Sequence, residues 1–377
     1  MKPTKLFLAF AVAVLLGACT EKTGKIHCHI EGAVPDSTYT MMLLAPSGSD
    51  FRVVDADSIP VIDGKFAFDL YVDEVMPYQL VSMEEHNLGS MFPCEFFAEE
   101  GTINATFYHY ERDAKPPTVK CDGPINMKFR EYDAELNRRL APLLQEIESL
   151  INIEQWDSPR MEELNTMFRA TMNKCSEEYI RNDRSIVGLY LLMRQALWMS
   201  RSEADESLYI SLYNEIYQPL FPNHPLSKQI EEWIQSLGIK VGNRYIDFTA
   251  PALDGTLHTL SKEIGGKIAL IDLWASWCGS CRRTSKSMIP LYEKYKERGF
   301  TVVGVARESK REDMERALAR DGYPWLNLLE LQDEHKIWER YGVSRAGGIT
   351  VLVDRDGTIL AIHPTAEEVE RILQEKL

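Results

Sequence analysis

The spacing of apolar residues changes character along the chain and first predicts a region built from strands. Between residues 25 and about 120, short apolar or alternating runs such as KIHCHIEG and GKFAFDLYV are separated by Gly, Pro, Asp and Ser. This pattern is typical of antiparallel strands in a β-sandwich or barrel. Asp63-Gly64 stands between two apolar runs and predicts a hairpin turn. We therefore expect a β-sandwich-like domain over residues 19–122.

The middle of the chain, residues 123–238, has the periodicity of helices. From Phe129 to Leu150, apolar residues recur every three or four positions, which predicts an amphipathic helix. Pro142 falls inside this stripe and is expected to kink or split the helix. The segment SIVGLYLLMRQALWM is apolar on nearly all sides. It predicts a buried helix, because it is too short and too interrupted by charge to span a membrane.

Residues 239–377 alternate between strand and helix patterns, which predicts an α/β domain with strands joined by crossovers. IALIDLW and TVVGVA are short and almost wholly apolar, as expected of strands buried on both faces. ITVLVD and TILAIHP flank Asp356-Gly357 and predict a hairpin. TAEEVERILQEKL predicts a closing helix with Thr365 as its N-cap.

The first residues predict a targeting segment that is not part of the fold. Lys2 and Lys5 precede LFLAFAVAVLLGA, an apolar run shorter than a membrane span. The run ends in LGAC, which resembles the lipobox of bacterial lipoproteins. That resemblance implies removal of residues 1–18, attachment of lipid to Cys19, and a membrane-tethered, extracytoplasmic protein of the bacterial cell envelope. An ordinary signal peptide with an incidental cysteine is the alternative.

The net charge and the motifs that are missing exclude several classes of partner and activity. The formal net charge of −15 argues against nucleic acid as a partner and against adhesion to anionic lipid surfaces. No kinase-like phosphate loop, serine triad or dinucleotide fingerprint occurs in the sequence.

Four cysteines lie away from the WCGSC motif. Disulfides persist outside the cytoplasm, so these cysteines could form bridges. No spacing dictates a pairing among them, and buried free thiols are an equal alternative. These four are Cys28, Cys94, Cys121 and Cys175, of which the last is expected to be unbridged.

The motif WASWCGSCRR is the strongest chemical signal, and it admits a zinc site or a redox pair. A structural zinc site needs four ligands, usually as two such pairs. No cysteine follows Cys281, and the later histidines are not spaced as a second half-site. We therefore expect no metal. The later histidines are His258, His335 and His363.

The surroundings of the motif favour a redox pair. A predicted buried strand leads into Cys278, and a predicted amphipathic helix follows it. Free N–H groups and the dipole at a helix N-terminus favour a thiolate, and Arg282 and Arg283 add positive charge. Helical spacing brings Cys281 within bonding reach of Cys278. We expect Cys278 to be the nucleophile and Cys281 the resolving thiol, with this redox-active disulfide in place of any bound cofactor.

Two parts of the chain resemble known families. DFTAPALDG, the strand after it, WASWCGSC and the order of later elements resemble the thioredoxin superfamily over about 140 residues. The closest resemblance is to the TlpA/ResA-like thiol–disulfide oxidoreductases, which share features with the AhpC/TSA family. DSIPVIDGKFAFDL and FFAEEGTINATF resemble DUF4369, a β-domain found ahead of thioredoxin-like modules in Bacteroidetes lipoproteins.

The thioredoxin resemblance implies further site residues. Asp272 matches the buried acid that moves a proton to or from the resolving cysteine, and burial should raise its pKa. Trp274 and Trp277 match the tryptophans that flank the active site, with Trp277 beside the disulfide. Gly347 and Gly348 match the loop that faces the disulfide and docks substrate chains. These two tryptophans and two glycines are the expected substrate-binding residues.

The sequence departs from the family pattern near this site. Gly348 stands where the family has a cis-proline, and a cis bond before a non-proline residue is costly, so we expect a trans bond and a roomier groove. Lys286 replaces the proline that kinks the helix, and Thr284 stands where Tlp-like proteins often carry Glu. The Gly-Ser pair between the cysteines differs from Gly-Pro. These changes leave the redox potential and the substrate range open.

Three functions compete. The first is a lipid-anchored oxidoreductase that reduces disulfides in client proteins with electrons from an unidentified donor in the envelope. The second is an AhpC/TSA-type peroxidase, against which Trp277 stands, since peroxidases carry a threonine and a proline just before their reactive cysteine. The third is a binding module whose thioredoxin-like domain has weak or lost turnover, an idea motivated by Gly348.

Overall fold

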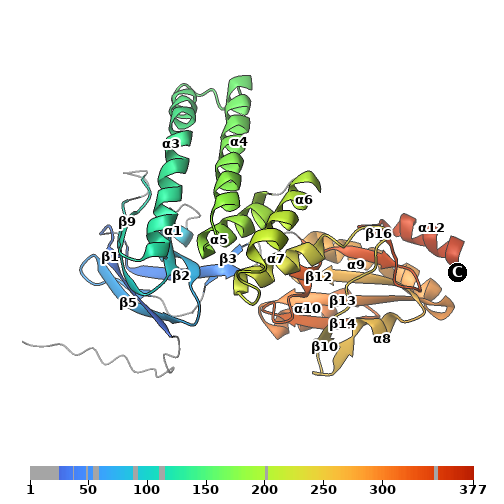
Figure 1. Ribbon diagram of the computed structural model, residues 1–377. Helices are drawn as coiled ribbons and strands as arrows, with labels where there is room; N and C mark the ends of the chain where they lie inside the picture. Colours follow the sequence, from blue (N-terminus) through green and yellow to red (C-terminus); the bar gives the residue numbers. More distant parts are fainter. Residues whose placement is uncertain are drawn as a thin grey trace, which may run out of the picture.

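The computed structural model describes residues 25–36, 38–47, 50–53, 59–87, 92–109, 115–199, 203–343 and 347–377. The expected leader and the expected lipidation site at Cys19 lie outside the described residues. The described chain forms three successive regions, with the strand-rich region and the α/β region on either side of a helical one (Figure 1). None of the helices described in these ranges is both long and apolar enough to cross a membrane.

The first region is a pair of sheets that share one apolar core. One sheet has the order β5-β1-β8-β9, and the other has the order β3-β2-β6-β7 with β4 paired to β2. Alternate residues point inward, so Cys28 and Ile30 from one sheet meet Leu80 and Phe96 from the other. The expected sandwich is thus confirmed, although β1 and β8 pair in parallel. The elements are β1 (Ile26–Ala33), β2 (Thr40–Ser47), β3 (Asp50–Val53), β4 (Ile59–Pro60), β5 (Lys65–Val72), β6 (Met76–Ser82), α1 (Met83–Asn87), β7 (Cys94–Ala98), β8 (Gly101–Thr106) and β9 (Thr118–Cys121).

The second region is helical, and α3 and α4 stand side by side as a long hairpin (Figure 1). α3 passes through Pro142 without ending there, so the expected split does not occur. α5 is buried on nearly every side, as its sequence predicts, and forms the centre of the core of this region. The elements are α3 (Pro124–Asn152), α4 (Pro159–Asn182), α5 (Ile186–Arg194), the π-helical turns η1 (Gln195–Met199) and η2 (Tyr213–Tyr217), α6 (Glu203–Leu212) and α7 (Pro225–Ser236).

The third region is built on a five-stranded sheet with the order β14-β13-β12-β15-β16. The strands β12, β13 and β14 run parallel, whereas β15 and β16 form the expected antiparallel hairpin. β12 is buried along its whole length, as IALIDLW predicts, and α9 packs against it. This arrangement confirms the expected thioredoxin-like α/β domain.

The elements of the third region follow the predicted alternation, and a small two-stranded sheet precedes them. Thr365 caps the last helix in a capping box with Glu368, which confirms the predicted N-cap. The elements are β10 (Thr249–Pro251), β11 (Leu257–Thr259), α8 (Leu260–Ile264), β12 (Ile268–Trp274), α9 (Gly279–Tyr295), η3 (Lys296–Arg298), β13 (Phe300–Glu308), α10 (Arg311–Asp321), β14 (Leu326–Leu331), α11 (Ile337–Arg340), β15 (Thr350–Val353), β16 (Ile359–Ile362) and α12 (Ala366–Lys376).

Candidate active site

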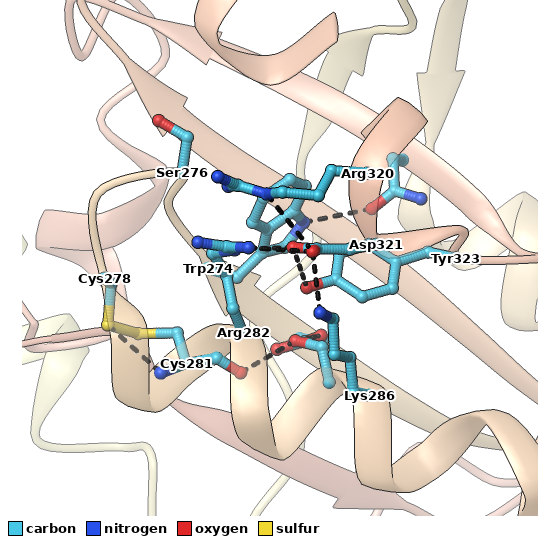
Figure 2. Close-up of polar contacts among 12 residues, drawn as sticks. Trp274, Ser276, Cys278, Cys281, Arg282, Lys286, Arg320, Asp321 and Tyr323 are labelled. Carbon is cyan, nitrogen blue, oxygen red and sulfur yellow. Dashed lines mark hydrogen bonds and ion pairs between the residues drawn. A yellow bond between two sulfur atoms is a disulfide. The ribbon is translucent and has the colours of Figure 1, made fainter. Parts of the chain in front are cut away.

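The two cysteines of the motif lie where the central strand passes into a helix. β12 ends at Trp274, and Cys278 is the N-cap residue of α9, which begins at Gly279. Cys278 and Cys281 are joined in a disulfide, with their Cα atoms 5.3 Å apart (Figure 2). Their exposed fractions are 6% and 9%, so only a small part of each residue reaches the surface. The expected proximity of the two sulfurs is confirmed, while their catalytic roles stay predictions.

Backbone N–H groups surround the sulfurs. The amide of Cys281 donates to Cys278 Sγ at 3.2 Å, and the amide of Gly348 donates to Cys281 Sγ at 3.0 Å. The hydroxyl of Ser280 lies 3.5 Å from Cys278 Sγ. In the reduced protein, donors aimed at a sulfur stabilise its thiolate and lower its pKa, as does the N-terminus of a helix.

The two arginines after the motif have different surroundings. Arg282 binds Asp321 through Nε at 2.5 Å and Nη2 at 2.8 Å, and Lys286 binds the same carboxylate at 2.8 Å (Figure 2). These cations hold the pKa of Asp321 well below its usual range. Arg320 also lies 3.5 Å from this carboxylate, so three cations share one negative charge and the cluster stays positive. The expectation that Arg282 adds positive charge near Cys278 stays a prediction.

Arg283 lies near the cysteines without an ion-pair partner. It is exposed, and it forms no ion pair with any of the described residues. A Cβ atom placed on Gly279, the residue after Cys278, would lie 3.7 Å from Arg283 Nη1. Its guanidinium therefore lies beside the first turn of α9, where it adds to the positive potential of the helix N-terminus.

Asp272 lies under α9, in the middle of β12. The residue is 1% exposed, and its Oδ2 accepts a hydrogen bond of 2.6 Å from the hydroxyl of Ser285. Burial raises the pKa of Asp272 to about 7, and the hydrogen bond from Ser285 opposes the rise. The expected raised pKa is thus found, while the proton-transfer role stays a prediction. Ser285 was not anticipated, although its place one turn after Cys281 puts it on the same face of the helix.

The two tryptophans of the motif differ in accessibility. Trp277 is 62% exposed and lies next to Cys278 at the surface. Trp274 is fully buried, donates from Nε1 to Asn327 Oδ1 at 3.0 Å, and packs edge-to-face on Tyr323. The expectation that Trp274 binds substrate is therefore wrong, because its side chain belongs to the domain core.

The glycine pair faces the disulfide from the start of β15. Every peptide bond in the described residues is trans, as expected for Gly348. A Cβ atom on Gly348 would lie 1.6 Å from the carbonyl oxygen of Leu273, so this glycine is pressed against β12. The roomier groove expected at Gly348 stays a prediction. A side chain at Gly347 would face the sulfurs, since a Cβ atom there would lie 3.2 Å from Cys278 Sγ.

A second buried carboxylate holds the loop before the cysteines, and unlike Asp272 it was not anticipated. Glu308 at the end of β13 accepts hydrogen bonds from the amide of Ser276 at 2.5 Å and from its hydroxyl at 2.8 Å. Burial raises the pKa of Glu308. A glutamate that ends a buried strand was the available signal, but its partner 32 residues earlier was not visible from the sequence.

The remaining described cysteines are free thiols away from this site. Burial raises the pKa of Cys28 to about 11 and that of Cys94 to about 12. Cys175 is also buried, and it is unbridged as expected, whereas Cys121 is half-buried. Within the residues that the structure covers, no group of three or more His, Cys, Asp or Glu side chains could hold a metal ion.

Comparisons with known proteins follow this division of the chain. Residues 241–362 match the AhpC/TSA family, and residues 28–123 match a domain of unknown function, DUF4369. The thioredoxin-like protein YneN of Bacillus subtilis is 31% identical over 143 residues, which cover 37% of this chain and 82% of YneN. The thiol-disulfide oxidoreductase ResA of Geobacillus kaustophilus is 28% identical over 143 residues, which cover 37% of this chain and 80% of ResA.

A solved structure is also similar to part of this chain. The thioredoxin domain of a thiol-disulfide oxidoreductase from Bacteroides vulgatus is 27% identical, with a TM-score of 0.34. The match covers 36% of this chain and 97% of that domain. The resemblances expected from the sequence, to thioredoxin-like oxidoreductases and to DUF4369, are confirmed by the family and sequence matches.

Proposed function

Because this chain belongs, through residues 241–362, to the AhpC/TSA family and resembles thiol–disulfide oxidoreductases there, we propose that it reduces disulfides in client proteins outside the cytoplasm. The observation that carries the proposal is the Cys278–Cys281 disulfide at the N-terminus of α9. Both sulfurs there receive backbone N–H groups, and Trp277 and Gly347 flank their accessible edge.

The proposed reaction begins with the reduced protein. The thiolate of Cys278 attacks one sulfur of a client disulfide, so that a mixed disulfide forms and the other client sulfur leaves as a thiolate. Asp272 then accepts the proton of Cys281, and the new thiolate attacks Cys278 Sγ. The bond between Cys278 and the client breaks, and the client leaves with two electrons more than it had. The chain is left with the Cys278–Cys281 disulfide seen here.

Continued turnover needs a source of two electrons for the disulfide. We propose a thiol donor in the cell envelope, which reverses the steps above. The envelope location and a lipid anchor on Cys19 rest on the LGAC pattern after the apolar run. Labelled palmitate should enter the wild-type chain but not a Cys19→Ser variant, and equal labelling of both would contradict the anchor.

A trapping experiment tests the reaction. In a Cys281→Ser variant the resolving thiol is gone, so client proteins should accumulate as mixed disulfides with Cys278. They should appear as reductant-sensitive conjugates on non-reducing gels. The matched control is a Cys278→Ser, Cys281→Ser double variant, which should capture nothing. Equal capture by both variants, or failure of the wild type to reduce insulin disulfides, would contradict the proposal.

The alternative peroxidase activity has its own measurement. The match to the AhpC/TSA family is the observation that keeps it in view. Hydrogen peroxide consumption by the reduced wild type, lost on replacement of Cys278 and faster than insulin reduction, would favour it over reduction of client disulfides.

A further inference from the structure

Ser285 lies between the buried acid and the helical turn that carries the second cysteine. It is fully buried on α9, one turn after Cys281. Its Oγ is 2.6 Å from Asp272 Oδ2 and 3.0 Å from the backbone carbonyl oxygen of Cys281. One hydroxyl therefore touches both the proposed proton acceptor and the backbone of the proposed proton donor.

A serine hydroxyl carries a single hydrogen and can also accept hydrogen bonds. When Asp272 is ionised, the hydrogen of Ser285 points to the carboxylate. When Asp272 is protonated, the carboxyl can donate its hydrogen to Ser285 Oγ, and the hydrogen of Ser285 can turn to the carbonyl oxygen of Cys281. Both protonation states of Asp272 are thus hydrogen-bonded without any movement of the backbone.

The cations nearest in sequence do not stabilise the Asp272 carboxylate. Arg282 and Lys286 are on the same helix as Ser285, but both bind Asp321. Burial and the hydrogen bond from Ser285 are the influences that set the pKa of Asp272, and no charged group contributes to it. The hydroxyl of Ser285 is therefore the main stabiliser of the charged form.

Two other hydroxyl groups lie near Ser285 and Asp272. Tyr323 donates to Asp321 at 3.3 Å. Burial raises the pKa of Tyr323, and a hydrogen bond with Ser285 opposes the rise. Thr350 is directly opposite Asp272 in the β12–β15 ladder, and its buried hydroxyl has no hydrogen-bond partner among the described residues. Thr350 is thus the group that could replace a lost donor at Asp272. The other neighbouring strand offers no side chain, since Gly304 is the partner of Asp272 there.

We propose that Ser285 is a positioning residue that sets the pH range in which Asp272 takes the proton of Cys281 during resolution of the mixed disulfide. The inference rests on the proposed function and deepens it. The proton moves from Cys281 Sγ to Asp272, the sulfur attacks Cys278 Sγ, and the bond from Cys278 to the client sulfur breaks. The client thiolate takes a proton from solvent.

The experiment measures resolution alone over a range of pH. The reduced chain is mixed with one equivalent of dithiobis(nitrobenzoate), so that attack by Cys278 releases one coloured thiol and resolution by Cys281 releases a second. The second release is followed by stopped flow from pH 5 to 9. In Ser285→Ala the acidic inflection should move up by about one pH unit, which is roughly the effect of one hydrogen bond to a charged group. The rate at pH 6 should fall about tenfold, and the rates at pH 9 should converge.

Matched variants separate this role from general damage to the helix. Ser287→Ala removes an exposed hydroxyl of the same helix, which donates only to the carbonyl of Thr284, and should leave the inflection unchanged. Ser285→Thr keeps a hydroxyl and should restore the wild-type profile. In an Asp272→Asn background the inflection should vanish, and Ser285→Ala should add no further pH-dependent change.

The outcomes that would overturn the proposal are specific. An unshifted profile in Ser285→Ala, or a shift that persists in the Asp272→Asn background, contradicts it. If a shift appears only when Thr350→Val is added, the role belongs to the pair of hydroxyls and not to Ser285. The pKa of the Asp272 carboxyl, read from its carbon-13 NMR shift in the oxidised chain, needs no turnover. A wild type that does not resolve mixed disulfides would contradict the proposed function, whereas an unchanged NMR titration in Ser285→Ala contradicts this inference alone.

Discussion

Replacing Asp272 by Asn should make the stability of the C-terminal domain less dependent on pH. The ordinary pKa of an aspartate is 3.8, and burial raises that of Asp272 to about 7. Between these values the folded domain binds the proton more tightly than the unfolded chain does. The stabilising contribution of the neutral carboxyl is complete below pH 3.8 and is lost as the pH rises towards 7. The asparagine variant has no such titration.

The size of the effect follows from the difference between the two pKa values. A difference of about three units corresponds to about 4 kcal/mol when the pH is well above both values. Only part of that range is crossed between pH 5 and pH 8, where the wild type should lose about 2 to 3 kcal/mol relative to the variant. The comparison of two pH values cancels any constant cost of burying the amide of asparagine.

The assay must report on this domain and not on the whole chain. Three separate cores make a single two-state transition a poor description of unfolding. Native-state hydrogen exchange of β12 peptides in the oxidised full-length chain gives the free energy of opening locally. It is measured at pH 5 and at pH 8, with exchange rates corrected for pH.

The matched control is Asp356→Asn. Asp356 lies exposed in the β15–β16 turn, where hydrogen bonds from Thr358 hold its pKa below the ordinary value. Its titration is complete below pH 5, so this variant should follow the wild type across the window. The reasoning would be refuted if Asp272→Asn lost as much stability between pH 5 and pH 8 as the wild type does.

Two further variants test the surroundings of the disulfide. Arg283→Gln should raise the pKa of Cys278 in the reduced chain by about half a unit, because it removes an exposed and partly screened charge. The pH dependence of alkylation measures this pKa. Arg282→Gln is the comparison and should have the smaller effect, because Arg282 is held in the ion pair with Asp321. Gly348→Ala should destabilise the domain by about 3 kcal/mol or more, because the new methyl group meets the Leu273 carbonyl at 1.6 Å. Native-state hydrogen exchange of β12 peptides measures this loss.

Each of these two predictions has a result that would contradict it. An equal rise in thiol pKa in both arginine variants would mean that Arg282 also acts on the cysteine despite its ion pair with Asp321. A Gly348→Ala variant as stable as the wild type would mean that the loop before β15 can move away from β12. Gly347→Ala is the useful comparison, since the atoms nearest to its methyl group would be the two sulfurs and the hydroxyl of Ser280, none nearer than 3.2 Å.

The sequence by itself determined the local features of this protein. Alternating apolar positions predicted the strands of the first region, and the wholly apolar run ending in Trp274 predicted the buried central strand. The same run, followed by an amphipathic pattern, was enough to place Cys278 at a helix N-terminus. These features follow from the neighbours of each residue, because strand and helix periods act over a few positions.

Only the tertiary structure decided which distant groups meet. Arg282 and Arg283 are adjacent in sequence, yet one is bound to Asp321, 39 residues away, and the other is left beside the cysteines. The place of Gly348 against Leu273 and the partnership of Ser285 with Asp272 were equally invisible. Periodicity shows which face of an element is buried but not what it is buried against, and the identity of that neighbour sets the charge and the space at the site.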